Sequence, residues 1–217
     1  MNKKIGIACM IAGVLLLASA VLLLFYNRRE AEQAGEAAQT ALTEIKREIG
    51  GRQTAQQAEL AAQSGTSSAA ASSAGTAQSE QRTGMTVANI GGYDYVGYLS
   101  IPALGLQLPV MADCDLTRMG IAPCRQFGST WTDDLVIAGH NYRQHFGEIQ
   151  TLEAGDAVQF TDMDGNEIAY LVREIRLVNP GDADKAKNSG YDLVLYTCTY
   201  GARYRVLVCC SREASGG

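Results

Sequence analysis

The chain has 217 residues, with 23 acidic against 18 basic side chains and a formal net charge of −5. A surface that binds nucleic acid needs a basic patch or stripe, so this balance argues against a nucleic-acid partner. Once a terminal apolar segment and a low-complexity stretch are set aside, the remainder is long enough for one folded domain only.

The apolar segment predicts a membrane anchor within residues 1–28. Ile5–Tyr26 carries almost no polar side chain. As a helix it would span about 33 Å, enough to cross a hydrocarbon core of about 30 Å. Lys3 and Lys4 precede the run and favour a cytoplasmic N-terminus, although two arginines follow it. We therefore expect a single-pass protein of the cell membrane whose folded part is extracellular.

The competing interpretation is a cleaved signal peptide. Ala18-Ser19-Ala20 resembles a cleavage site of small residues. However, the apolar run continues past it to Phe25, where a cleavable signal should turn polar. An uncleaved anchor is therefore favoured, and in both cases the folded part lies outside the cytoplasm.

Residues 29–89 predict a stalk. The composition up to about residue 49 favours a helix with a thin apolar stripe: Ala34, Ala38, Leu42, Ile45 and Ile49. Because alanine buries little area, a solvated helix is favoured over a short coiled coil, and Gly50-Gly51 should end it. Gln63 to Gln81 lacks aromatic residues, so we expect a disordered spacer that holds the folded domain away from the membrane.

Residues 90–217 predict a mostly-β domain of barrel or sandwich type. Short apolar runs alternate with turn residues, and helical patterns are limited to short turns near Leu116 and Phe146–Leu152. Asp164-Gly165 predicts a hairpin turn. The expected strands are Val96–Ile101, Leu106–Met111, Leu135–Ala138, Ala157–Thr161, Glu167–Val178, Leu193–Thr197 and Arg203–Cys210.

Five of the six cysteines belong to this domain. Cys198 follows a buried strand and precedes a tight turn and two arginines, a setting that favours a reactive thiolate. Cys114 and Cys124 bracket a short loop, and outside the cytoplasm they could form a disulfide. Cys209 and Cys210 are neighbours on a strand, so they should point to opposite faces.

The strand Leu135–Ala138 leads to His140, one of two histidines in the chain. Acyl transfer by a thiol needs an imidazole to exchange protons and a donor for the oxyanion. Cys198, His140 and an arginine are therefore the candidate catalytic residues. His145, in the next loop, is interpreted as a packing residue or a surface residue that lines a groove. The spacing of the two histidines matches no common zinc-ligand pattern, so a zinc site is not favoured.

These motifs resemble those of a known family. Leu195-Tyr196-Thr197-Cys198 followed by Arg203-Tyr204-Arg205-Val206 resembles the TLxTC…R signature of sortases, and Ile137–Asn141 resembles their active-site histidine motif. The order of anchor, spacer, opening strand, His, Cys and Arg is also similar, from about Tyr95 to Cys210. The resemblance implies a closed eight-stranded β-barrel with short helices and a cysteine transpeptidase, with features closer to classes B and D.

The resemblance also implies residue roles. Cys198 would attack an LPxTG-like sorting signal of a surface protein, and His140 would protonate the leaving amine. An amine of a cell-wall precursor or a pilin lysine would then resolve the thioester. Arg205 directly precedes an aliphatic run, so it is favoured over Arg203 as the arginine that stabilises the oxyanion. The residues expected to bind substrate are Thr197, Arg203 and Asn141.

Two other functions stay open. A cysteine peptidase would only hydrolyse its substrate, although papain-like peptidases usually place Cys before His, and here His140 comes first. An anchored binding module would use Cys198 structurally. We expect no cofactor and no metal. Acidic loop residues that could bind calcium are interpreted as turn formers: Asp113, Asp115, Asp133, Asp134, Asp162 and Asp164.

Overall fold

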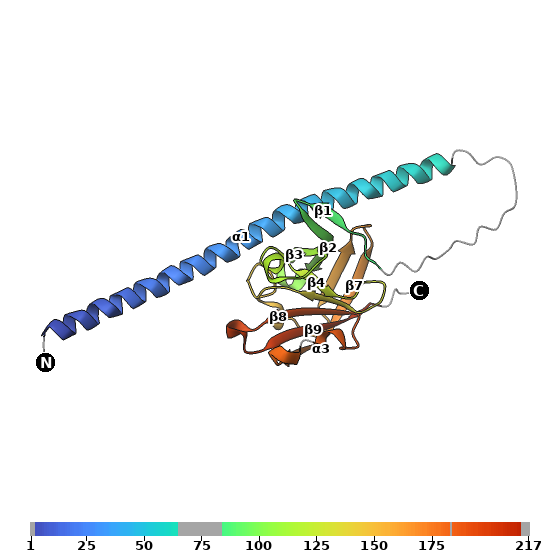
Figure 1. Ribbon diagram of the computed structural model, residues 1–217. Helices are drawn as coiled ribbons and strands as arrows, with labels where there is room; N and C mark the ends of the chain where they lie inside the picture. Colours follow the sequence, from blue (N-terminus) through green and yellow to red (C-terminus); the bar gives the residue numbers. More distant parts are fainter. Residues whose placement is uncertain (1–2, 65–83, 183, 214–217) are drawn as a thin grey trace.

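The computed structural model describes residues 3–64, 84–182 and 184–213 of the chain. Figure 1 shows two parts: a single long helix, α1 (Lys3–Ser64), and a β-barrel that lies against the middle of this helix. Nearly all of the predicted disordered spacer, from Gln63 to Gln81, lies outside the described residues.

Eight strands form the barrel in the order β2-β3-β4-β5-β8-β9-β7-β6, and pairing of β2 with β6 closes it. A further short strand, β1, pairs with β2 as a hairpin. The predicted mostly-β, eight-stranded fold with short helices is confirmed. The strands are β1 (Ala88–Ile90), β2 (Tyr93–Ile101), β3 (Leu106–Met111), β4 (Cys124–Phe127), β5 (Leu135–Ala138), β6 (Ala157–Asp162), β7 (Glu167–Val178), β8 (Leu193–Cys198) and β9 (Arg205–Arg212). The short helices are η1 (Pro102–Leu104), α2 (Leu116–Met119), η2 (Ile149–Thr151), η3 (Pro180–Asp182), α3 (Asp184–Lys187) and η4 (Tyr200–Ala202).

Most strands follow the sequence expectation. β3, β5 and β7 have the expected bounds, and the Asp164-Gly165 turn joins β6 to β7. β9 begins at Arg205 rather than Arg203, because η4 and the residue after it form the turn. β1 and β4 were not expected. β4 reads Cys-Arg-Gln-Phe, without apolar alternation, and it is a strand because it pairs with β5.

Alternation along β8 and β9 gives the barrel an inner and an outer apolar face. Leu195 lies in the main core, whereas Val194 lies in a second cluster that also contains Ala186 of α3. On β9, Cys209 belongs to the outer cluster and Cys210 to the main core. The prediction that these two cysteines point to opposite faces is therefore confirmed.

Helix α1 packs along the barrel, which corrects the expectation of a solvated stalk helix. Its apolar stripe is buried: Ala34, Ala38, Ala41, Leu42, Ile45 and Ile49. Ile45 and Ile49 share a cluster with Tyr95 of β2 and Met111 of β3. The small alanine side chains let the helix approach the barrel closely. Each alanine buries little apolar area itself, and most of the buried apolar area comes from the isoleucines and from barrel side chains.

The helix covers the open edge of β3. β3 pairs with β4 only at Met111, and Pro109 lies in this edge strand, where a missing N–H is tolerated. Gln39 Nε2 donates to the backbone oxygen of Gln107 at 3.2 Å, and Lys46 Nζ donates to Oε1 of the same residue at 2.6 Å. An edge covered in this way is not available for pairing with another chain.

Helix α1 continues through Gly50-Gly51, so the predicted stop at this pair is wrong. Ile49 and Gln53, on either side of the pair, pack on the β6–β7 turn. An ideal Cβ on Gly165 would lie 3.1 Å from Cγ2 of Ile49 and 2.3 Å from Nε2 of Gln53. These contacts offset the helix penalty of about 1 kcal/mol for each glycine.

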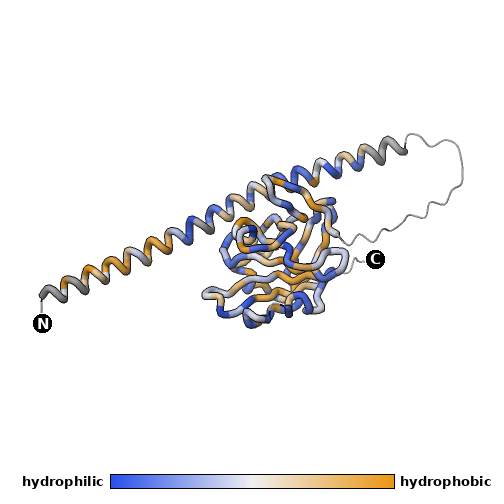
Figure 2. The backbone as a smooth tube through the Cα atoms, in the orientation of Figure 1, coloured by the Kyte–Doolittle hydropathy of each residue, from blue (hydrophilic) through white to orange (hydrophobic). Residues whose placement is uncertain are grey.

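The N-terminal part of α1 extends beyond the barrel and is the long hydrophobic stretch in Figure 2. Its large apolar side chains are exposed from Ile7 to Tyr26. In the described part of the chain, α1 is the one helix that is long and apolar enough to cross a membrane. The helix runs without a break through the predicted anchor boundary at residue 28.

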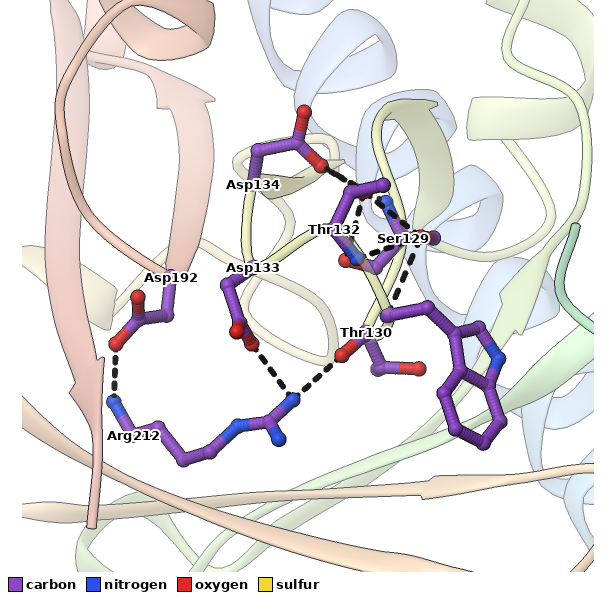
Figure 3. Close-up of polar contacts among 8 residues, drawn as sticks. Ser129, Thr130, Thr132, Asp133, Asp134, Asp192 and Arg212 are labelled. Atoms are coloured by element: carbon purple, nitrogen blue, oxygen red, sulfur yellow. Dashed lines mark hydrogen bonds and ion pairs between the residues drawn. The ribbon is translucent and has the colours of Figure 1, made fainter. Parts of the chain in front are cut away.

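The barrel end away from the candidate site is held together by Arg212, at the end of β9 (Figure 3). Its guanidinium lies 2.7 Å from Oδ1 of Asp133 and donates to the backbone oxygen of Thr130. Its backbone N–H donates to Oδ2 of Asp192 at 2.7 Å. These contacts tie the loop before β5 to the start of β8 and the end of β9.

Candidate active site

Cys198 and His140 come to the same edge of the sheet because their strands are parallel neighbours. The last residue of β5 pairs with Tyr196 of β8. The pairing continues past the strand end, since the Gly139 N–H donates to the Tyr196 oxygen at 3.0 Å and Thr197 Oγ1 donates to the Gly139 oxygen at 2.8 Å. His140 lies two residues after Ala138 and Cys198 lies two residues after Tyr196, so both follow the last pair of this register at the same edge of the sheet.

Arg205 lies on the other side of Cys198. The two residues are direct partners in the antiparallel pair β8–β9. Arg205 Nε donates to Oη of Tyr196 at 3.2 Å, and its Nη1 donates to the Ala202 oxygen at 3.3 Å. Tyr196 is two residues before Cys198 on the same face of β8, so its hydroxyl orients the guanidinium near the thiol.

The turn between β8 and β9 separates the two arginines. The Thr199 N–H donates to the Tyr204 oxygen at 3.0 Å, and its Oγ1 accepts the Tyr204 N–H at 3.1 Å. Gly201 has a φ of 78°, in the left-handed region that favours glycine. Arg203 follows η4 in this turn and is exposed, whereas Arg205 lies on β9 and pairs with Cys198. The geometry therefore supports Arg205 over Arg203 as the arginine next to the sulfur.

The three residues predicted to bind substrate differ in their settings. Thr197 is 3% exposed, and its hydroxyl is bonded to Gly139. Its side chain alternates to the opposite face of β8 from Cys198 and links β8 to β5, so we do not expect it to contact a substrate. Asn141, directly after His140, is partly exposed, and Arg203 is exposed at the turn.

The loop that carries His140 is wound tightly around Phe146. Phe146 is fully buried, its N–H donates to the His140 oxygen at 3.0 Å, and an ideal Cβ on Gly139 would lie 2.7 Å from its ring. The Gly147 N–H donates to the Tyr142 oxygen at 2.8 Å. The rings of His140 and Tyr142 are stacked, with centroids 4.9 Å apart. The imidazole is thus presented by an ordered loop.

His145 is fully buried in this loop, so of the two interpretations, a packing or a surface residue, the structure supports packing. Its ring tilts against Tyr142, with centroids 5.7 Å apart, and faces the backbone of Ala34 in α1. Neither ring nitrogen has a hydrogen bond of ordinary geometry among the described residues. Burial lowers the pKa of His145 to about 4; the Ala34 backbone opposes this shift, and His140 adds to it.

The His145 imidazole should make the fold sensitive to mild acid. Between pH 6.5 and about 4 the unfolded imidazole is protonated and the folded one is not, so the unfolded state binds more protons. Stability that is present above pH 6.5 is lost as the pH falls towards 4, by about 3 kcal/mol in total. Urea unfolding of the wild type and of His145→Phe at pH 7.5 and 4.5 should show a smaller loss in the variant. Equal losses in both proteins would contradict this assignment.

The five cysteines of the barrel domain differ in solvent exposure and in the pKa of their thiols. All five are free thiols, and only Cys198 and Cys114 are partly exposed. A hydrogen bond between the thiols of Cys114 and Cys124 lowers the pKa of the first and raises that of the second. Burial raises the pKa of Cys209 to about 11 and that of Cys210 to about 12. Of the five, Cys198 is the partly exposed thiol that lies next to the His140 strand.

Two of the acidic loop residues, Asp115 and Asp162, are used within their own turns. Asp115 accepts the N–H of Arg118 at 2.7 Å and caps α2. Asp162 accepts the N–H groups of Asp164 and Asn166 at 3.0 and 2.8 Å. In the ranges that the structure describes, no group of three or more His, Cys, Asp or Glu residues could hold a metal ion.

Solved structures with a similar fold are sortases. Sortase A from Corynebacterium diphtheriae is 21% identical with a TM-score of 0.51, over 57% of this chain and 63% of that one. Sortase C from Streptococcus pneumoniae is 22% identical with a TM-score of 0.50, over 57% and 70%. Sortase C from Clostridium perfringens is 25% identical with a TM-score of 0.47, over 55% and 70%. No curated protein sequence matches the chain.

A comparison with protein families matches residues 99–213, just over half of the chain, to the sortase domain. This match begins in β2 and ends after β9, so it covers every strand that contributes to the candidate site. The chain therefore belongs to the sortase family.

Proposed function

We propose that this sortase, a cysteine transpeptidase, cleaves an LPxTG-like sorting signal and joins the acyl part to an amine. The observation that carries the proposal is the position of Cys198, on a strand whose two neighbours bring His140 and Arg205 to the same edge. A structural cysteine would not need a parallel neighbour that is followed two residues later by histidine, or an antiparallel partner that starts with arginine.

The reaction begins at the Cys198 sulfur. The thiolate attacks the scissile carbonyl, an S–C bond forms, and the C–N bond breaks as His140 passes a proton to the leaving amine. The product is a thioester with the enzyme. A second amine then attacks the thioester, the C–S bond breaks, and the proton of this amine passes to His140.

Arg205 stabilises the negative oxygen that forms in both steps. Its guanidinium is fixed by the Tyr196 hydroxyl and the Ala202 carbonyl, so little reorganisation is needed when charge develops. The exposed Tyr200 and Tyr204 lie in the adjoining turn, 73% and 42% exposed. Aromatic rings beside the thiol offer an apolar surface to an extended peptide, with Arg203 and Asn141 at its margins.

The proposed substrates are those that membership of the sortase family implies. The acyl donor is a surface protein with a C-terminal sorting signal, and the acceptor is an amine of a cell-wall precursor or a pilin lysine. Helix α1 supports a location at the cell membrane, with Lys3 and Lys4 in the cytoplasm and the barrel outside.

The docked part of α1 supports a site close to the membrane surface. Ala34, the first buried residue of the stripe, follows Tyr26 by eight residues, which is about 12 Å of helix. Because the helix itself packs on the barrel, the short part of α1 between Tyr26 and Ala34 sets the distance of the site from the membrane surface.

Product analysis tests this function. The full chain in detergent is incubated with a sorting-signal peptide, with and without triglycine. We expect a ligated product that increases with the triglycine concentration at the expense of hydrolysed peptide. Hydrolysis that triglycine does not affect would identify a cysteine peptidase. No cleavage of any peptide in a sorting-signal library, together with an inert Cys198, would identify a binding module.

A further inference from the structure

The loop from His140 to Gly147 packs between the barrel and helix α1. An ideal Cβ on Gly35 of α1 would lie 3.0 Å from Cγ and 3.2 Å from Cβ of Gln144. The next loop residue, His145, is fully buried and faces the backbone of Ala34. Helix and loop thus meet at a close contact, at which a Cβ at position 35 would require Gln144 to shift by a few tenths of an ångström.

The same contact leads to the candidate catalytic imidazole. The Tyr142 ring lies between two histidines, 5.7 Å from the His145 ring and 4.9 Å from the His140 ring, measured between centroids. The backbone follows the same path, because the His145 N–H donates to the Tyr142 oxygen at 2.9 Å. A shift of the buried ring would therefore move Tyr142, and with it the surface on which His140 stacks.

His145 is an expensive residue for a packing position. A buried imidazole with two unpaired nitrogens costs more than a phenyl ring of similar shape, because its polar atoms lose their water. The ionisable group that acts on the ring is His140, which adds to the lowering of the pKa of His145. Because His140 opposes a charge on the ring, we assign the role of His145 to the shape of its ring.

We propose that α1 is a working part of the catalytic domain, in which Gly35 and His145 are positioning residues for His140. The helix clamps the loop at Gly35, the buried His145 ring supports Tyr142, and Tyr142 sets the plane of the His140 imidazole. This inference rests on the proposed function for the role of His140. It also means that the barrel without α1 would carry a displaced histidine.

A matched pair of glycine variants tests the clamp in the full chain. Gly35→Leu introduces a side chain at the loop contact, whereas Gly51→Leu adds the same side chain to the same helix, where nothing lies within 4 Å of the new Cβ. We expect kcat/KM for transpeptidation to fall about tenfold or more in Gly35→Leu, with kcat as the main component, and to stay within about twofold in Gly51→Leu. Circular dichroism melting checks that both variants are folded.

Histidine NMR gives a readout independent of activity. The chain has two histidines, so the imidazole spectrum should contain two signals, one from His140 and one from the buried His145. Gly35→Leu should move the His140 shift and its titration midpoint, and Gly51→Leu should leave both unchanged. This readout persists if the chain has no transpeptidase activity, so it separates failure of the clamp from failure of the proposed function.

Two substitutions of His145 separate ring shape from simple stability. His145→Phe keeps an aromatic ring against Tyr142 and should retain activity within about threefold, with the pH–rate profile unchanged. His145→Ala removes the ring, and we expect about a tenfold loss or more and a shifted His140 titration. The proposal is overturned if Gly35→Leu and Gly51→Leu give the same activity and the same His140 titration, or if His145→Ala leaves the His140 signal in place.

Discussion

Replacing Cys198 with alanine is expected to abolish both cleavage and ligation of a sorting-signal peptide. The sulfur is the atom that forms the thioester, and a methyl group cannot take its place. By analogy with the loss of other catalytic nucleophiles, kcat/KM should fall by roughly 10⁴-fold or more. The rates are measured by chromatography of the peptide products under single-turnover conditions.

Cys114→Ala is the matched control for this substitution. Cys114 is the other partly exposed thiol among the described cysteines, but it lies beside Cys124 rather than beside His140. The control should keep its activity within about twofold, because surface substitutions away from a site have small effects. Equal losses in the two variants, or a fully active Cys198→Ala, would contradict the role of Cys198.

The second large effect is expected at Arg205. Arg205→Ala removes the guanidinium that the β8–β9 register sets next to the sulfur, and kcat should fall about 10²- to 10³-fold, as for loss of one oxyanion donor. Arg205→Lys keeps the charge but loses the planar fork that bonds Tyr196 and the Ala202 carbonyl, so it should recover only part of the rate.

Arg203→Ala is the control for the arginine assignment. It removes the same charge two residues away, from the exposed turn, and should change kcat less than about threefold. A rise in KM in this variant would fit contact of Arg203 with the substrate. A large loss of kcat in Arg203→Ala with an active Arg205→Ala would reverse the roles of the two residues.

The candidate site could be predicted from sequence because its residues lie at the ends of strongly apolar strands. Leu135–Ala138 and Leu193–Cys198 are buried runs that are recognisable without neighbours. Their parallel pairing, which brings the two strand ends to the same edge of the sheet, is a long-range contact that no local pattern encodes; the family resemblance indicated it. The exact start of β9 depended on the turn at Gly201, which leaves Arg203 off the strand.

The role of α1 could not be predicted in the same way. Its stripe is mostly alanine, and the sequence does not indicate that β3 has an open edge which the helix can cover. Gly50-Gly51 stays helical because Ile49 and Gln53 pack on the β6–β7 turn, which is a tertiary effect that overrides local propensity. Gly35 has no distinguishing local pattern, since its importance comes from Gln144, far along the chain.

The most direct test of the account is mass spectrometry of the acyl-enzyme. The full chain in detergent is mixed with a sorting-signal peptide without an added amine, quenched in acid and digested, and the thioester is mapped. The account predicts an acyl adduct on the peptide that contains Cys198, which disappears with formation of ligated product when triglycine is added. An adduct on Cys114 or another cysteine, or ligation without any adduct on Cys198, would contradict it.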